Sequence, residues 1–267
     1  MSGSVLDAVV AGARRSAELR ERATVRDAFE RAWRERRPRG TEFEAALRQS
    51  GVRIIAECKR RSPAKGVLRP SYDPVAIAHS YESAGAAAIS VLTEPTFFDG
   101  SLEHLAAVRS AVQCPVLCKD FLTTEFQLFE ARAAGADAVL LIVAALDAAA
   151  LRQLIARTGA LGLAALVEVH DHDELDSAIQ AGARIVGVNS RNLRTLDVST
   201  DVLTALAPSI PSNVVAVAES GLQSAGDVRR LRSIRYNAFL IGERLMRDAD
   251  PGSALAAIIA NAGTEER

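Results

Sequence analysis

Short apolar runs alternate with amphipathic segments along most of the chain after residue 52. Eight of these runs have the length and the aliphatic composition of buried strands. They cover residues 53–58, 86–92, 115–118, 137–142, 163–169, 184–188, 214–218 and 238–241. The segments between them place apolar residues at helical spacing, and a last helical pattern covers residues 251–262. The pattern therefore predicts eight strands that alternate with helices.

The same pattern favours a closed barrel. Strands that are apolar throughout and separated by helices are typical of a parallel sheet, because helices cover both of its faces. Eight units favour a (β/α)8 TIM barrel over an open doubly wound sheet. Three predicted helices end in Ala-Gly-Ala, at residues 84–86, 134–136 and 181–183. Glycine there supplies the positive φ that ends a helix, so the helix boundaries agree with the strand pattern.

The first fifty residues form a separate, basic segment. Residues 14–39 contain ten arginines and five acidic residues. Val25, Phe29 and Trp33 recur at every fourth position, which predicts an amphipathic helix with one packing face, followed by a shorter helix at 43–47. Acidic residues interleave with the arginines at helical spacing, so we interpret the charge as a solvated helix face rather than a nucleic-acid site.

Composition limits the class of protein. The chain has 267 residues, a net charge of −1 and 49% hydrophobic residues, so a large core is expected without a general attraction to nucleic acid or membranes. No apolar stretch reaches the length of a membrane span, and the N-terminal residues lack the order of a signal peptide. We predict a cytoplasmic protein with one barrel domain over residues 1–267, in which residues 1–50 are a helical extension packed on the barrel.

Lysine is rare in the chain. Twenty-nine arginines occur but only three lysines, at Lys59, Lys65 and Lys119. Arginine cannot readily donate its proton, whereas a lysine ammonium can when its surroundings shift its pKa. Lys59 and Lys119 each end an apolar run, which suggests that a titratable ammonium is needed there; retention by chance stays open.

Polar residues stand at the carboxyl ends of several predicted strands, at positions that share one face. In a barrel, the catalytic groups lie at the carboxyl ends of the strands. Successive side chains of a strand point to opposite faces, so Glu57 and Lys59 share one face while Cys58 takes the other. If the polar set points inward, Cys58 faces the apolar layer beneath the helices. In chain order these strand ends contribute Glu57, Lys59, Lys119, Glu168, Asn189, Arg191, Glu219, Ser220 and Gly242.

Glycines follow the last two strands. Gly221 and Gly242 lie where backbone N–H groups can approach a ligand just before a helix, and loops at this place commonly bind phosphate in such barrels. Either glycine alone is equally consistent with an ordinary turn. Together they favour a phosphorylated small-molecule substrate.

These motifs resemble the indole-3-glycerol phosphate synthase family of tryptophan biosynthesis. The resemblance covers residues 1 to about 262 and depends on AECKRRSPAKG (56–66), ISVLTEPTFFDGS (89–101), VLCKDF (116–121), LVEVH (166–170), VNSRNL (188–193), AESG (218–221) and IGERLM (241–246). Two positions depart from it: Ala64 replaces a usual serine, and Glu243 stands where some members have serine. The second departure suggests that a backbone amide, not a hydroxyl, binds phosphate there.

The resemblance implies a decarboxylating lyase that forms indole-3-glycerol phosphate from 1-(2-carboxyphenylamino)-1-deoxyribulose 5-phosphate. It implies that Lys119 is the general acid and Glu168 the base of the later dehydration. Lys59 would hold the substrate carboxylate, with Glu57 and Asn189 orienting groups around it. The remaining matched positions are Ser62, Gly221, Gly242 and Glu243 for phosphate, Arg191 and Ser220 for other substrate contacts, and Phe98, Phe121 and Leu140 for the apolar wall.

Such chemistry requires an acid and a base but no metal or organic cofactor. A lysine donates a proton efficiently only if its pKa approaches the working pH. We expect nearby arginines and Lys59 to supply the cationic field that lowers the pKa of Lys119. We also expect a monomer, and contacts with other enzymes of the pathway stay open.

Some of these residues also fit other interpretations. The segment His170-Asp171-His172-Asp173 could bind a metal, although Asp171 or Asp173 is better explained as a helix cap. Cys114 and Cys118 lack a second ligand pair for zinc, and an odd count of three cysteines predicts reduced thiols. A Schiff-base aldolase that uses Lys119 or Lys59 as nucleophile is not excluded by the residues. A non-catalytic phosphometabolite-binding barrel would not explain a complete acid–base set.

Overall fold

A closed barrel of eight parallel strands forms the centre of the computed structural model, which describes residues 5–24 and 37–263. Around the barrel the strands are β1 (Ile54–Cys58), β4 (Ala88–Leu92), β5 (Val116–Lys119), β6 (Ala138–Ile142), β7 (Ala164–Val169), β8 (Ile185–Asn189), β9 (Val215–Glu219) and β10 (Ala238–Ile241). Their bounds lie within two residues of the predicted runs. The predicted (β/α)8 barrel is therefore confirmed.

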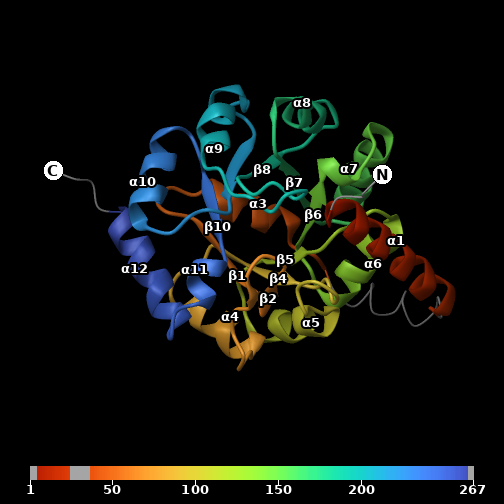
Figure 1. Cartoon of the computed structure of the whole chain (residues 1–267), viewed down its shortest axis with the longest axis horizontal. Helices are drawn as coiled ribbons and strands as arrows, with labels where there is room; N and C mark the ends of the chain where they lie inside the picture. The colour runs from red at the N-terminus through yellow and green to blue at the C-terminus, as the bar shows by residue number, and fades with distance from the viewer. Residues whose placement is uncertain (1–4, 25–36, 264–267) are drawn as a thin grey trace.

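Helices surround the strands (Figure 1). They are α1 (Val5–Ala23), α3 (Gly40–Arg48), α4 (Pro74–Ser83), α5 (Leu102–Ala111), α6 (Glu125–Ala134), α7 (Ala148–Ala160), α8 (His172–Gln180), α9 (Asp201–Leu206), α10 (Ala225–Ser233), α11 (Glu243–Met246) and α12 (Pro251–Gly263), with the 3₁₀ turns η1 (Val143–Ala145) and η2 (Ala207–Ser209). A small hairpin, β2 (Arg61–Ser62) and β3 (Gly66–Val67), follows β1 and was not predicted.

Local sequence signals fix the helix ends. Several helices begin after a side chain that accepts a hydrogen bond from the first turn, which stabilises each helix by about 1 kcal/mol. These caps are Asp73, Ser101, Thr124, Asp147, Asp171 and Ser224. The glycines of the three Ala-Gly-Ala segments all have positive φ, as expected for helix ends.

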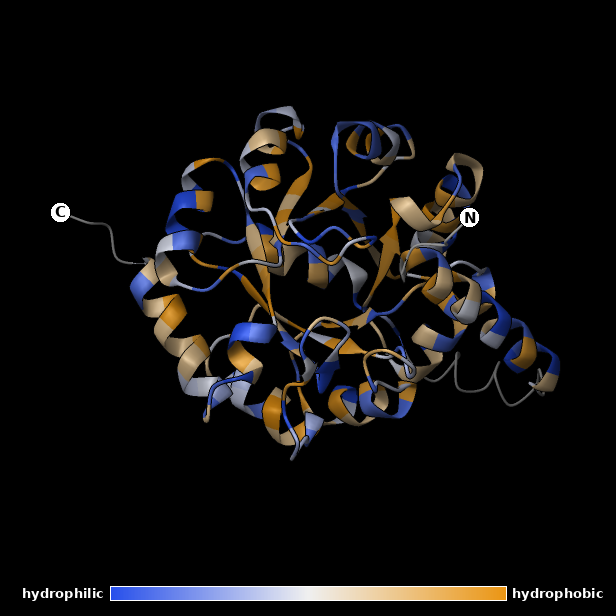
Figure 2. Cartoon of the chain, in the orientation of Figure 1, coloured by the Kyte–Doolittle hydropathy of each residue, from blue (hydrophilic) through white to orange (hydrophobic). Residues whose placement is uncertain are grey.

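The core has two apolar regions. One lies between the strands and the helices, and it includes Cys58 and Cys118, as the strand alternation predicted. The other lies inside the barrel. Figure 2 shows the strands as a mostly hydrophobic centre and the helices with polar and apolar sides.

The N-terminal helices cover different parts of the barrel. Helix α3 packs on β7 and β9, and its Phe43 and Leu47 are fully buried in the interior cluster of the barrel. Helix α1, which the sequence did not separately predict, contacts α6 and η1 and buries Leu6 and Val9. The helix predicted through Val25, Phe29 and Trp33 lies outside the described residues.

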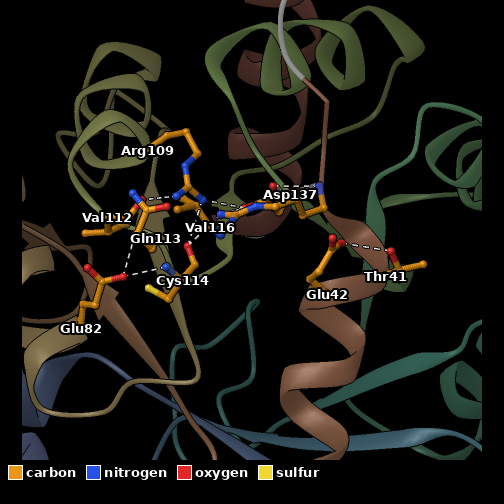
Figure 3. Close-up of polar contacts among 10 residues, drawn as sticks. Thr41, Glu42, Glu82, Arg109, Val112, Gln113, Cys114, Val116 and Asp137 are labelled. Carbon is orange, nitrogen blue, oxygen red and sulfur yellow. Dashed lines mark hydrogen bonds and ion pairs between the residues drawn. The ribbon is translucent and has the colours of Figure 1, made fainter.

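Asp137 links the extension to the amino ends of the strands. Its Oδ1 accepts a hydrogen bond from Arg39 N at 2.9 Å, and its Oδ2 accepts from Val116 N at 2.9 Å and from Arg109 Nη1 at 2.8 Å. Figure 3 shows Arg109 and Val116 converging on this carboxylate. Since Asp137 is almost fully buried, the cluster is a structural anchor at the end of the barrel opposite to the carboxyl ends of the strands.

Within the described ranges, no helix combines the length and the apolar character that crossing a bilayer requires.

Candidate active site

Four charged side chains form one layer at the carboxyl ends of alternate barrel strands. They are Glu57 on β1, Lys119 on β5, Glu168 on β7 and Glu219 on β9. Barrel interiors are filled by such layers of four side chains from alternate strands. The residues two positions earlier on the same strands are Ile55, Leu117, Leu166 and Val217. All four are completely buried, so the charged layer lies directly on an apolar one.

Ion pairs connect the layer. Lys119 Nζ lies 3.4 Å from Glu168 Oε2 and 3.6 Å from Glu219 Oε2. Both of these carboxyl side chains are only 1% exposed. Lys59 Nζ lies 2.6 Å from Glu57 Oε1 at the edge of the layer. Lys59 and Lys119 therefore each have at least one carboxylate partner.

The surroundings of Lys119 differ from the expectation. Burial alone would lower the pKa of Lys119, but Glu168, Glu219 and Glu57 outweigh burial and raise it. The predicted cationic field is wrong, because the layer places carboxylates rather than arginines next to this ammonium. Lys119 is therefore protonated at neutral pH, and its carboxylate neighbours make the free ammonium a weaker acid than an unperturbed lysine.

The two glutamates beside Lys119 have opposite pKa shifts. Burial raises the pKa of Glu219, and the negative charge of Glu168 adds to this although Lys119 opposes it. Burial would also raise the pKa of Glu168, but Lys119, followed by His170 and Asn189, lowers it. Glu168 is therefore a carboxylate at neutral pH, while Glu219 retains a proton more readily. Divergent pKa values in such a pair are typical of acid–base sites.

A glycine makes room for Glu219. A Cβ on Gly187 of β8 would collide with Glu219 Oε1. Sequence reasoning assigned no role to Gly187, and Glu219 was noted only as a strand end. The sequence does contain a signal for this contact, because a glycine inside an apolar strand often marks a place where another group approaches the backbone closely.

Asn189 and Arg191 extend the site across the end of β8. Asn189 Oδ1 accepts a hydrogen bond from Arg191 N at 2.9 Å, which leaves its amide group to donate to Glu168. Arg191 Nη2 lies 3.5 Å from Glu243 Oε2, and Arg247 Nη1 lies 3.8 Å from Glu243 Oε1. Two guanidinium groups therefore balance the charge of Glu243, where an anionic ligand was predicted to bind.

The turns after β9 and β10 bring backbone close to the site. Ser220 and Gly221 both have left-handed conformations, with φ of 65° and 71°. For a serine this conformation costs about 1 kcal/mol or more, and such strain is concentrated at ligand sites. At the other turn, a Cβ on Gly242 would collide with the side chain of Glu57. Both turns therefore depend on their glycines.

A cavity of about 550 Å³ opens over the charged layer. The predicted site residues that line it are Glu57, Lys59, Phe98, Lys119, Phe121, Leu140, Glu168, Asn189, Arg191, Ser220, Gly221, Gly242 and Glu243. Ser62 is not among them and lines an adjoining cavity of about 70 Å³. The third lysine, Lys65, is exposed at the edge of the larger cavity.

One wall of the cavity is aromatic. The ring centroids of Phe98 and Phe121 lie 6.3 Å apart. The buried Glu94 carboxylate holds the segment before Phe98, because it accepts hydrogen bonds from Thr96 N, Phe97 N and Phe98 N at 2.9, 2.6 and 3.2 Å. Sequence reasoning missed Glu94, although an acid that directly precedes a turn is a candidate for such backbone contacts.

His170 lies in the segment that the sequence offered as a metal site. Asp171 accepts a hydrogen bond from Glu174 N and caps α8, as predicted. Over the part of the chain that the structure describes, no three His, Cys, Asp or Glu side chains form a group that could hold a metal ion. His170 instead contacts Glu168 and Glu174, with ring nitrogens 3.4 and 3.0 Å from their carboxylate oxygens.

Solved structures with low sequence identity share the fold. A 3-hexulose-6-phosphate synthase from Salmonella typhimurium has a TM-score of 0.65 at 14% identity and covers 79% of this chain and 98% of its own. KGPDC from Streptococcus mutans has a TM-score of 0.62 at 13% identity and covers 80% and 98%. At this identity, the likeness shows the barrel fold alone.

Close relatives identify the family. Indole-3-glycerol phosphate synthase from Mycolicibacterium gilvum is 48% identical over 98% of this chain and 96% of the relative. Indole-3-glycerol phosphate synthase 1 from Streptomyces coelicolor is 47% identical over 96% and 95%. The family model described as indole-3-glycerol phosphate synthase matches residues 6–258. The chain belongs to the indole-3-glycerol phosphate synthase family.

Proposed function

We propose that the chain closes the indole ring of indole-3-glycerol phosphate, with Lys119 as general acid and Glu168 as base. The substrate is 1-(2-carboxyphenylamino)-1-deoxyribulose 5-phosphate, and the reaction loses carbon dioxide and water. The observation that carries the proposal is the placement of Lys119 between two buried glutamates of opposite pKa shift. Membership of the family supplies the substrate.

The first step forms a carbon–carbon bond. The ring carbon that bears the carboxylate attacks the ribulose carbonyl, and the carbonyl oxygen takes the proton of Lys119. Carbon dioxide then leaves, and the electron pair that it leaves behind restores the aromatic ring. A positioned general acid contributes about 10²- to 10⁴-fold to such a step.

The second step removes water. The hydroxyl leaves as water with a proton from Lys119, after Glu219 has reprotonated it, and Glu168 accepts the proton that the substrate loses. Glu168 suits this role because it is ionised, and Asn189 and Lys119 hold it in place. Glu219 retains a proton more readily and can return one to Lys119, whose Nζ lies 3.6 Å away.

Binding relies on local charge, because the chain as a whole is nearly neutral. Lys59 would bind the substrate carboxylate in competition with Glu57, and Phe98, Phe121 and Leu140 would contact the aromatic ring. The phosphate would contact the backbone at Gly221 and Gly242 and the guanidinium of Arg191. The enzyme is also proposed to be a monomer in the cytoplasm. Analytical ultracentrifugation tests the monomeric state.

The test is turnover of the carboxyphenylamino substrate, followed through the fluorescence of the indole product. Product formation without added metal or organic cofactor is expected. A purified, folded protein that forms no product would contradict the proposal. Borohydride treatment with substrate tests the Schiff-base alternative, and it should leave no adduct on Lys59 or Lys119.

A further inference from the structure

His170 has a defined geometry that no step above uses. It lies two residues beyond Glu168, so both side chains extend from the same face of the chain at the end of β7. His170 Nε2 lies 3.4 Å from Glu168 Oε1, and His170 Nδ1 lies 3.0 Å from Glu174 Oε2. The same Glu174 oxygen accepts a hydrogen bond from His170 N at 2.8 Å. Glu174 therefore fixes both the backbone and the ring of His170.

The two contacts define the protonation state of the ring. A carboxylate can only accept hydrogen bonds, so a ring nitrogen that faces one must donate. Because both nitrogens of His170 face carboxylate oxygens, this geometry favours the imidazolium form of the ring. Burial would lower the pKa of His170, but the neighbouring carboxylates of Glu168 and Glu174 outweigh burial and raise the pKa to about 10.

Two carboxylates lie within ion-pair distance of the His170 ring among the described residues. Glu168 faces it from β7, and Glu174 faces it from α8. The neighbouring turn η1, which contacts both α8 and β7, contains only Val143, Ala144 and Ala145. Lys119 reaches Glu168 through the other carboxylate oxygen, Oε2.

Glu168 is thus held between two cations, one on each oxygen. We propose that His170 is a positioning residue, whose imidazolium keeps Glu168 ionised and directs its carboxylate toward the substrate. This inference rests on the proposed role of Glu168 as base. His170 itself transfers no proton to the substrate.

The need for a second cation follows from the proposed reaction. When Lys119 gives its proton to the substrate, it loses its charge, and Glu168 loses one of its two cationic neighbours. The imidazolium then remains as the fixed positive charge beside it. Glu168 Oε1 and His170 Nε2 are both buried, and at 3.4 Å their contact is longer than a well-formed hydrogen bond. Catalytic contacts are often long before substrate binds and shorten in the complex.

Three variants test the inference by steady-state kinetics across pH. His170→Ala removes the ring, and His170→Gln keeps an N–H donor without the charge. His172→Ala is the control, because His172 is an exposed histidine two residues away, at the start of α8. We expect His170→Ala to lower kcat about tenfold to hundredfold, the usual cost of losing an orienting partner, with little change in KM. The control should match the wild type.

The conservative variant and the pH profile separate positioning from a merely structural role. His170→Gln should recover part of kcat, because its amide can still donate toward Glu168. Both His170 variants should move the acidic limb of kcat/KM upward by about 1 pH unit, since Glu168 protonates more easily without the neighbouring cation. In a Glu168→Gln background, His170→Ala should cause no further loss of kcat.

Two results would overturn the inference. One is a folded His170→Ala variant whose kcat and acidic limb match those of the control. The other is a loss that adds in full to that of Glu168→Gln, because His170 would then act elsewhere.

Imidazole NMR gives a readout that does not depend on activity, and only four histidines need assignment. His170 should stay protonated at about pH 8, where an unperturbed imidazole is neutral. A neutral ring there contradicts the inference even if the enzyme is active. A protonated ring in a wild-type protein without turnover contradicts the proposed function instead.

Discussion

Replacing Lys119 with arginine separates charge from proton donation. Arginine is the common cation of this chain, with twenty-nine occurrences against three lysines. A guanidinium keeps the positive charge between Glu168 and Glu219 but holds its proton at any accessible pH. If Lys119 only supplied charge, Lys119→Arg would stay active. If Lys119 donates a proton, it should be nearly as inactive as Lys119→Met.

The distances give the size of the effect. Lys119 Nζ lies 3.4 and 3.6 Å from two carboxylate oxygens. At an effective dielectric constant of 20, an ion pair at such a distance is worth about 4–5 kcal/mol before desolvation is counted. Arginine retains this attraction and methionine loses it, so Lys119→Arg is the variant expected to fold well. Loss of the general acid should lower kcat by about 10²- to 10⁴-fold, or about 3–5 kcal/mol in the barrier.

The assay combines turnover, substrate binding and a folding check by circular dichroism. Both variants should bind substrate through Lys59 and the turns after β9 and β10. Lys65→Arg is the matched control, because Lys65 is exposed at the edge of the cavity, and this variant should keep most of the activity. A folded Lys119→Arg variant with more than about a tenth of wild-type turnover would refute the general-acid role.

Three further predictions concern other parts of the molecule. Glu168→Gln should lower turnover by about 10²-fold or more with little effect on substrate binding, and near-normal kinetics would transfer the basic role to another carboxylate. A crystal soaked in phosphate should show the anion between the turns of Gly221 and Gly242, and an anion elsewhere with these turns empty contradicts the assignment. Asp137→Asn should lower the free energy of unfolding by about 3 kcal/mol in denaturant titrations, because it leaves the guanidinium of Arg109 without its carboxylate, while kcat stays unchanged.

The barrel was predictable because its signals are local. Each strand is a short apolar run, and polar residues near the ends of β1, β5, β7, β8 and β9 mark the catalytic end of the barrel. Alternation within a strand places Glu57 inside and Cys58 outside without any knowledge of neighbouring strands. The inward position of the charged residues was therefore accessible from the sequence.

The pairing of those residues was not accessible in the same way. Lys119 and Glu168 are 49 positions apart, and their contact depends on how alternate strands share a layer inside the closed barrel. The sequence suggested arginines around Lys119 because arginines are abundant, but abundance does not give position. The sequence therefore predicted the wrong direction for the pKa shift of Lys119.

Helix α1 and the hairpin β2–β3 show a different limit. Leu6 and Val9 alone do not reveal where α1 packs. Their position becomes clear only in the structure, where they line the small cavity beside Phe98 and Phe121. The two-residue strands of the hairpin are too short to produce a periodic pattern. The sequence likewise grouped His170 with the residues that follow it as a possible metal site, whereas in the structure its ring contacts Glu168 of the charged layer.

The charged layer also gives a physical reason for a lysine in a chain that prefers arginine. A guanidinium beside Glu168 and Glu219 could bind two carboxylate oxygens at once, and it would hold both glutamates in place without releasing a proton. The compact ammonium of Lys119 contacts one oxygen of each glutamate and leaves Glu168 Oε1 to His170. Charge compensation alone favours arginine at this position, whereas reversible proton transfer requires lysine. The composition of the chain and the geometry of the layer thus support the same role for Lys119.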